Sequence, residues 1–282
     1  MNVRAIQILV TRRCNLHCSY CHLQRDATED LSWSSLKAAL EILLERSQGE
    51  LAFTFTGGEP LLAFDTIRQC VAFVEATPCR VRAVKWHVVT NGTVLNREAL
   101  GFFDAHRFAV SLSFDGLPIA QAQRSENTFH IIDNLLDLVQ EEYPALFDRA
   151  LKIRMTLTPA TVPILADSIE YLLDRNVRKI DIDPAFGPAP WEPAEIRVLR
   201  DQFARVAEML GACRERGHIP VTLFDFGPLG LRFGKKKWTC GAVGGNGIAI
   251  DADGRSYACV FACPPYQVGT VAALQRAVGA LA

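Results

Sequence analysis

Strand-like and helix-like hydrophobic patterns alternate along most of the chain, and this alternation limits the fold more than any other feature. Six β-rich apolar runs are each followed by a segment with apolar residues at helical spacing. The predicted strands span 5–10, 51–55, 85–89, 108–113, 151–157 and 179–183. The predicted helices span 32–46, 64–75, 96–105, 127–139, 162–175 and 194–216. Such units, at a repeat of roughly 30–40 residues, are typical of a parallel sheet with crossover helices.

The number of units predicts the architecture. Six β-α units are two short of a closed eightfold barrel, so we expect a partial (β/α)6 TIM-like barrel of the α/β class. Its functional loops should follow the carboxyl ends of the strands. After residue 217 the pattern predicts a hairpin of strands at 247–250 and 256–260 and a helix at 271–281. The sequence therefore predicts a barrel domain at 1–217 and a small module at 218–282.

Composition excludes several classes of protein. Of the 282 residues, 49% are apolar and 22% are charged, which suffices for a core and excludes intrinsic disorder. A net charge of −1 argues against binding of nucleic acid or a membrane surface by bulk charge. The first apolar run is too short for a signal peptide, and no stretch approaches the roughly 18 apolar residues of a membrane span. We therefore expect a soluble, cytoplasmic protein in a reducing compartment.

Cysteines are the residues that most suggest chemistry. In a reducing compartment, clustered cysteines among a total of 9 indicate metal ligands rather than disulfides. Cys14, Cys18 and Cys21 lie within eight residues, directly after the first predicted strand. Three thiolates can hold three irons of a cubane cluster and leave the fourth iron open for chemistry. The alternative is a zinc site completed by His17 or His22, although this spacing is unusual for zinc.

The cysteine loop resembles a known family signature. The segment Arg12-Arg13-Cys14-Asn15-Leu16-His17-Cys18-Ser19-Tyr20-Cys21 is similar to the signature loop of the radical S-adenosylmethionine (SAM) superfamily. Further similar motifs follow the next three predicted strands: Gly57-Gly58-Glu59-Pro60, Thr90-Asn91-Gly92-Thr93, and Ser113-Phe114-Asp115-Gly116 with Arg124. The resemblance implies a [4Fe–4S] cluster on Cys14, Cys18 and Cys21. It also implies SAM binding by Tyr20, Gly57, Gly58, Glu59, Asn91, Ser113 and Arg124.

These residue types suit SAM. At Gly57 and Gly58 the backbone can approach SAM closely, and the Glu59 carboxylate can accept from its ammonium group. The predicted partners of the ribose and the carboxylate are Asn91, Ser113 and Arg124. The resemblance places Tyr20 near the adenine. Taken singly, each residue is also compatible with a strand-end turn or a satisfied loop polar group.

The remaining cysteines fall into two sets. Those at Cys70, Cys79 and Cys213 stand singly, and we expect them to pack as small hydrophobic residues. The tail set is Cys240, Cys259 and Cys263, and its spacing around Gly254 resembles a Twitch or SPASM extension. This resemblance implies a second iron–sulfur cluster; reduced thiols beside a Gly-rich turn are the alternative. The sequence stops at 282 where a full SPASM tail continues, so we expect one of three cases: the cluster has an open or non-cysteine position, the chain is truncated, or no cluster forms.

The resemblance also implies an activity. A reduced cluster would cleave SAM to a 5′-deoxyadenosyl radical that abstracts hydrogen from a substrate, with an electron donor such as flavodoxin or ferredoxin. Relatives with a Ser-x-Asp-Gly motif often modify peptides or proteins, including ribosomal peptides and sulfatases. The absence of a leader-binding segment before the barrel keeps a small-molecule dehydrogenase or cyclase as the alternative. A non-enzymatic iron–sulfur or zinc protein is a remote third hypothesis. We expect Phe186 and Trp191 to line the substrate mouth or to pack in the loop.

Overall fold

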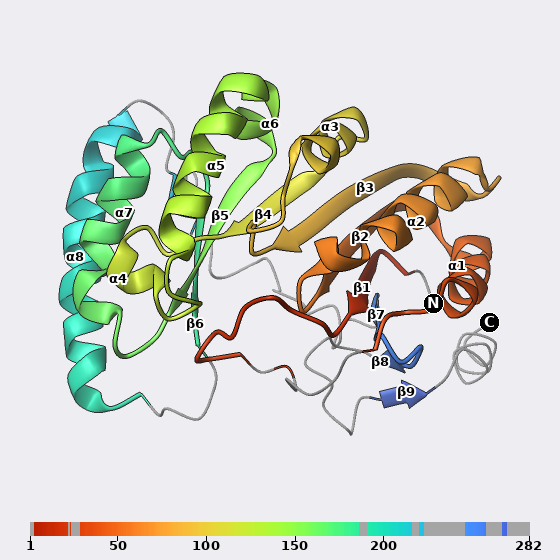
Figure 1. The fold of residues 1–282 in the computed structure, drawn as a ribbon, viewed down its shortest axis with the longest axis horizontal. Helices are drawn as coiled ribbons and strands as arrows, with labels where there is room; N and C mark the ends of the chain where they lie inside the picture. Colours follow the sequence, from red (N-terminus) through yellow and green to blue (C-terminus); the bar gives the residue numbers. More distant parts are fainter. Residues whose placement is uncertain are drawn as a thin grey trace.

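Six parallel strands form the centre of the computed structural model, drawn in Figure 1. The structure describes residues 3–21, 23, 29–185, 191–215, 220–222, 246–257 and 267–269. The central strands are β1 (Ala5–Thr11), β2 (Gln48–Gly57), β3 (Arg80–Thr90), β4 (Ala109–Ser113), β5 (Leu151–Leu157) and β6 (Ile180–Pro184). Each pairs in parallel with the next in chain order. This arrangement confirms the predicted partial (β/α)6 barrel.

Helices follow the strands where the hydrophobic period predicts them. They are α1 (Trp33–Arg46), α2 (Phe64–Ala76), α3 (Arg97–Ala105), α5 (Thr128–Glu142), α7 (Leu165–Asp174) and α8 (Pro193–Glu215). Ser32 caps α1 by accepting from the Ser35 amide at 3.2 Å, and Asn96 caps α3 by accepting from the Ala99 amide at 3.0 Å. Figure 1 shows the helices along one side of the curved sheet. Among the described helices, none is long and apolar enough to cross a membrane.

Four short helical segments supplement this pattern. They are η1 (Pro60–Ala63), α4 (Pro118–Gln121), α6 (Pro144–Arg149) and η2 (Val162–Ile164). The sequence pattern predicted η2 as the start of the helix at 162–175 and did not predict the other three. Segments this short show too little helical periodicity to be recognised from sequence. In all four a proline lies in the first turn, where its missing N–H has no helical partner to lose.

The two faces of the strands differ in polarity. Phe53 and Trp86, on neighbouring strands, are buried in the core shared with the helices, and their ring centroids lie 4.9 Å apart. Thr54 and His87 alternate with them and face the other way, into the barrel. The sheet therefore presents an apolar face to the helices and a partly polar face to the interior.

A second set of strands extends the sheet beyond β1. Strand β7 (Gly247–Ile250) pairs with β1 in parallel, β8 (Ser256–Tyr257) pairs with β7 antiparallel, and β9 (Gln267–Gly269) pairs with β8 antiparallel. The predicted tail hairpin is confirmed at 247–250 and 256–257, and it belongs to the same sheet as the barrel; the predicted strand residues 258–260 lie outside the described residues. The predicted helix at 271–281 lies outside the described residues. The domain division at 217 stays a prediction.

Candidate active site

A cavity of about 430 Å³ lies where β1 to β4 end. Cys14, Cys18 and Cys21, in the loop after β1, line this cavity. The other predicted residues that line it are Tyr20, Gly57, Gly58, Asn91, Ser113 and Arg124. The fold thus brings almost every predicted cofactor residue to one place, because the carboxyl ends of parallel strands meet at one edge of the sheet. Glu59 is the predicted residue that does not line the cavity.

The cysteine loop is bound to neighbouring segments on two sides. The Arg13 guanidinium donates to both carboxylate oxygens of Asp30, at 2.8 and 2.7 Å. The Ser19 amide donates to the Gln123 carbonyl at 2.9 Å, which ties the loop to the segment that follows β4. These contacts give the loop a defined path across the end of the barrel.

The three thiols suit an iron–sulfur cluster by their chemistry. Cys14 and Cys21 are exposed and Cys18 is half-buried. Burial raises the pKa of the Cys14 thiol, and hydrogen bonds to its Sγ from the Leu16 amide (3.4 Å) and from Asn91 Nδ2 (3.9 Å) oppose that rise. Cysteine thiolates are the usual protein ligands of such clusters. In the described parts of the chain, no three His, Cys, Asp or Glu side chains are already gathered as a metal-binding group.

The glycine pair at the end of β2 is required by the cysteine loop itself. A Cβ on Gly57, which has φ of +142°, would lie 2.2 Å from the Thr11 carbonyl oxygen, and one on Gly58 would lie 2.1 Å from the Arg13 carbonyl oxygen. The Gly58 amide donates to the Thr11 carbonyl at 2.9 Å. Both glycines also line the cavity, so close approach to SAM at this point stays a prediction. Their demonstrated role is to let the backbone after β1 pack against β2.

Glu59 connects β2 to β3 from a fully buried position. Its Oε1 accepts from Thr90 Oγ1 at 2.7 Å and from the Leu61 amide at 3.1 Å, and its Oε2 accepts from the Asn91 amide at 2.7 Å. Burial raises the pKa of Glu59 to about 7, against the effect of these hydrogen bonds. The carboxylate therefore holds Asn91 at the cavity rim. Direct contact between Glu59 and the SAM ammonium stays a prediction.

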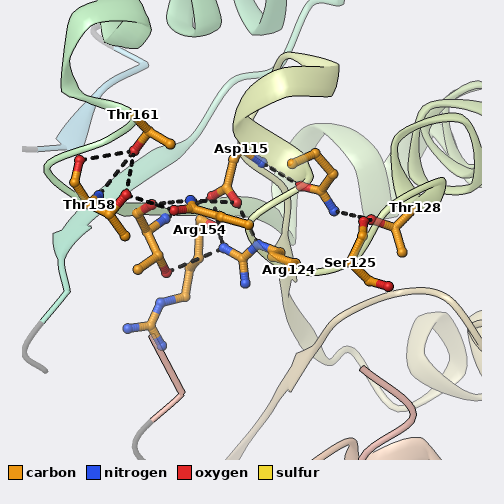
Figure 2. Close-up of polar contacts among 10 residues, drawn as sticks. Asp115, Arg124, Ser125, Thr128, Arg154, Thr158 and Thr161 are labelled. Carbon is orange, nitrogen blue, oxygen red and sulfur yellow. Dashed lines mark hydrogen bonds and ion pairs between the residues drawn. The ribbon is translucent and has the colours of Figure 1, made fainter. Parts of the chain in front are cut away.

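Arg124 lies in a buried network on the β4 side of the cavity. Figure 2 shows its guanidinium and the Asp115 carboxylate pointing toward each other, joined by bonds of 2.7 and 2.9 Å. The Thr156 amide also donates to Asp115, at 2.9 Å. Burial opposes the charge on Arg124, but the interaction with Asp115 outweighs it, so the pKa of Arg124 is raised. The guanidinium carbon also lies 5.5 Å from the centre of the Tyr20 ring.

A family comparison agrees with this geometry. The model described as "Radical SAM superfamily" matches residues 8–159, more than half of the chain. The chain belongs to the radical SAM superfamily. The matched span contains the cysteine triad and every residue predicted to bind SAM. As a radical SAM enzyme it uses a [4Fe–4S] cluster and SAM.

Two relatives with named activities match part of this radical SAM enzyme. The cysteine-type anaerobic sulfatase-maturating enzyme of Clostridium novyi is 34% identical over 111 residues, which is 36% of this chain and 30% of the relative. The GTP 3',8-cyclase of Chlorobaculum tepidum is 32% identical over 137 residues, which is 46% of this chain and 40% of the cyclase. The chain therefore spans less than half the length of either relative.

A solved structure shares the fold over a longer span. Native anSMEcpe with bound AdoMet and Cp18Cys peptide superposes with a TM-score of 0.77, covering 96% of this chain and 78% of that one. The two sequences are 18% identical over this span. At that identity the likeness shows a common radical SAM fold and leaves the substrate open.

The interior wall of the radical SAM barrel contributes polar residues that sequence reasoning missed. Gln7, Thr54, His87 and Arg154 line the cavity. His87 Nε2 lies 2.8 Å from Ser111 Oγ, and Nδ1 lies 3.3 Å from Thr54 Oγ1. Burial lowers the pKa of His87 to about 4, and a nearby lysine and Arg154 add to that shift, so the imidazole is neutral at pH 7. Polar residues at alternate positions of otherwise apolar strands were the available signal.

The other predicted residues had different outcomes. Cys70 is buried in α2, as expected for packing, and Cys213 in α8 is half-buried. Cys79 is exposed, so the packing prediction is wrong there, because a loop leaves it at the surface. Trp191 is half-buried and donates from Nε1 to the Ala185 carbonyl at 3.2 Å. Outside the described residues lie His22, Phe186, Cys240, Cys259 and Cys263.

Proposed function

We propose that this radical SAM enzyme modifies a peptide or protein, with flavodoxin or ferredoxin as electron donor. When bound, the cluster supplies the electron that cleaves SAM to methionine and a 5′-deoxyadenosyl radical, which abstracts hydrogen from the substrate. The residues at the strand ends that line the cavity would hold the cofactors. Asn91 and Ser113 offer hydrogen bonds to SAM from the cavity rim.

The charge balance of the cavity wall carries the proposal for the substrate class. Each arginine that lines the cavity has a carboxylate partner within hydrogen-bonding distance. The pairs are Arg12 with Asp251, Arg124 with Asp115, and Arg154 with Asp183. Binding of a triphosphate is favoured by arginine or lysine side chains that are free to pair with its phosphates. Around the described part of the cavity no arginine or lysine lacks such a partner, which favours a substrate of low charge such as a peptide.

Two further observations, one on a relative and one on the cavity wall, support a peptide substrate. The Clostridium relative, named as a sulfatase-maturating enzyme, is the more similar of the two in identity. The polar groups of Gln7, Thr54 and His87 line the same cavity without adding charge to it. Such groups suit the amides and hydroxyls of a peptide.

The test compares substrates directly. The enzyme is reconstituted without oxygen and given SAM, dithionite, and either cysteine- and serine-containing peptides of sulfatase type or GTP. We expect a peptide to increase the formation of 5′-deoxyadenosine. The mass of that peptide should decrease by the hydrogen that it loses. The matched control is the Cys14/Cys18/Cys21→Ala variant, which should form no 5′-deoxyadenosine. Conversion of GTP, with no response to any peptide, would reject a peptide substrate.

A small-molecule substrate is the second candidate, and one observation favours it. The Chlorobaculum relative is named as a GTP 3',8-cyclase and matches a longer stretch of this chain than the Clostridium enzyme does. In the GTP arm of the same assay, this candidate predicts a new guanine-containing product. The paired state of the cavity arginines is the reason that we place it second.

We also propose a second iron–sulfur cluster on Cys240, Cys259 and Cys263. In sequence, two of these cysteines flank the β7–β8 hairpin, which pairs with the barrel sheet. Iron analysis of the Cys14/Cys18/Cys21→Ala variant tests it, because about four irons should remain if the tail binds a cubane cluster. A value near zero contradicts the proposal.

A further inference from the structure

The cysteine loop is joined to the tail hairpin by a bidentate ion pair. Arg12 lies two residues before Cys14 and donates from Nε to Asp251 Oδ1 at 3.1 Å and from Nη2 to Oδ2 at 2.5 Å. The side chains of Arg12 and Asp251 are 20% and 7% exposed, and Asp253 brings a second carboxylate to 3.6 Å from Arg12 Nη2. Two parallel bonds between planar groups restrict orientation as well as distance. The pair therefore holds the start of the loop in one position.

The carboxylate side of this pair belongs to a hydrogen-bonded turn. The Asp251 amide donates to the Arg255 carbonyl at 2.8 Å, and the Gly254 amide donates to the Asp251 carbonyl at 2.9 Å. Asp251 Oδ1 also accepts from the Ala252 amide at 2.7 Å. Gly254 adopts φ of +79°, which closes the turn between β7 and β8. The aspartate is thus part of a well-formed turn and does not depend on Arg12 for its place.

The same turn is attached to the barrel at the strand that leads into the loop. Strand β7 pairs with β1 in register from Ala5↔Gly247 to Ile8↔Ile250. The amides of Arg4 and Ala5 both donate to the Asn246 carbonyl, at 2.8 and 3.2 Å. Strand β1 then continues directly into Arg12 and the cysteines. The tail therefore supports both the strand and the loop that follows it.

On the other side, Arg12 borders the active site. It lines the cavity together with Cys14, and its amide donates to the Glu29 carbonyl at 2.9 Å. The next residue, Arg13, is bonded through its carbonyl to the Glu59 amide at 2.8 Å. Backbone contacts thus fix the loop on its β2 side, and the guanidinium of Arg12 fixes it on the tail side.

We propose that Arg12 and Asp251 form a positioning pair that holds the cysteine loop in the conformation that binds the cluster and SAM. The tail hairpin is then a structural part of the active site, in addition to any cluster that its own cysteines bind. This proposal rests on membership of the radical SAM superfamily and does not depend on the substrate class.

The test uses the full chain, reconstituted without oxygen, with Asp251→Asn as the main variant. We expect iron to be lost to a chelator about tenfold faster than from the parent, a factor that corresponds to about 1.4 kcal/mol. We also expect a smaller SAM-induced change in the electron paramagnetic resonance spectrum of the reduced cluster. The exchanged double variant, Arg12→Asp with Asp251→Arg, should recover a substantial part of both properties, because it restores a pair of opposite charges.

The matched control is Asp133→Asn. Asp133, in α5, pairs at 3.1 Å with Arg175, the residue directly after α7, and the side chains are 23% and 25% exposed; neither residue lines the cavity. This variant should lose iron to the chelator at the parent's rate and show the parent's SAM-induced change in the electron paramagnetic resonance spectrum, even if its thermal stability is lower. If Asp251→Asn does not fold, Arg12→Lys takes its place, because it keeps the charge and loses the bidentate geometry. Parent-like iron lifetime and SAM response in Asp251→Asn, or in Arg12→Lys, would overturn the proposal.

Discussion

The two sides of the cavity use charged and reactive side chains in different ways. On the β1 side, Arg13 and Asp30 pair with 42% and 48% of their side chains exposed, and the thiol of Cys14 is exposed as well. On the β4 side, the pair of Arg124 and Asp115 is 7% and 2% exposed. Exposed groups add little to stability but can reach a cofactor, whereas a broken buried pair leaves an uncompensated charge. We therefore expect the Arg13–Asp30 pair to contribute less to stability than the Arg124–Asp115 pair.

The largest effect should come from the cysteine side and should leave stability alone. In Cys14/Cys18/Cys21→Ala, we expect complete loss of SAM cleavage, because the ligands of the cluster are gone. The free energy of unfolding, measured on both proteins without iron, should change by no more than about 1 kcal/mol, since two of the three replaced side chains are exposed and that of Cys18 is half-buried. Formation of 5′-deoxyadenosine by this variant would contradict the assignment of the cluster ligands to the loop after β1.

The β4 side should show the opposite behaviour. We expect Asp115→Asn to lower the free energy of unfolding by about 3–5 kcal/mol, because the buried Arg124 keeps its charge and loses its partner. Urea unfolding of the iron-free protein measures this change. A loss of SAM cleavage with unchanged stability would show that Asp115 acts on the cofactor and that the comparison is wrong.

Glu59, which connects β2 to β3, should make stability depend on pH. Its folded-state pKa of about 7 lies above the ordinary value of 4.5, so the folded state holds the proton more tightly than the unfolded state. Protonated Glu59 therefore contributes fully to the free energy of unfolding below pH 4.5. This contribution falls as the pH rises through 7, by about 3 kcal/mol in total. Urea unfolding of the parent and of Glu59→Gln across this range measures the difference between them. A difference that does not vary with pH contradicts the prediction.

The smallest effect should come from the exposed pair on the β1 side. We expect Asp30→Asn to change the free energy of unfolding by no more than about 1 kcal/mol, because solvent screens the pair with Arg13. The change should shrink further in high salt. The matched comparison is Asp115→Asn, which removes the same charge from a buried pair. Equal effects of the two substitutions would remove burial as the cause of the difference.

Local sequence patterns predicted the main elements of this fold for a physical reason. Hydrophobic periods are properties of neighbouring residues, so the helices predicted to start at 32 and 96 begin within one residue of those positions, where Ser32 and Asn96 cap them. The short segments η1, α4 and α6 were missed because they contain too few residues to show a period. Cys79 was misjudged because cysteine identity alone does not distinguish a core position from an exposed loop position.

The candidate site divides in a similar way. The resemblance of the cysteine loop and of the motifs after three strands located the cofactor residues, since spacing after strand ends is local information. It did not reveal that the backbone of Thr11 and Arg13 occupies the space that side chains at Gly57 and Gly58 would need. Nor did it reveal that the Glu59 carboxylate is buried and accepts hydrogen bonds from the Thr90 hydroxyl and from the Leu61 and Asn91 amides.

By itself, the sequence determined the order of strands and helices, the partial-barrel class and the cysteine triad with its strand-end motifs. Only the tertiary structure decided that β7 pairs with β1 and that Arg12 meets Asp251, 239 positions away in the chain. Periodicity, capping and motif spacing act over a few residues and can be read directly. Contacts between distant segments depend on how the whole sheet closes and on which charges it buries, and no local pattern contains that information.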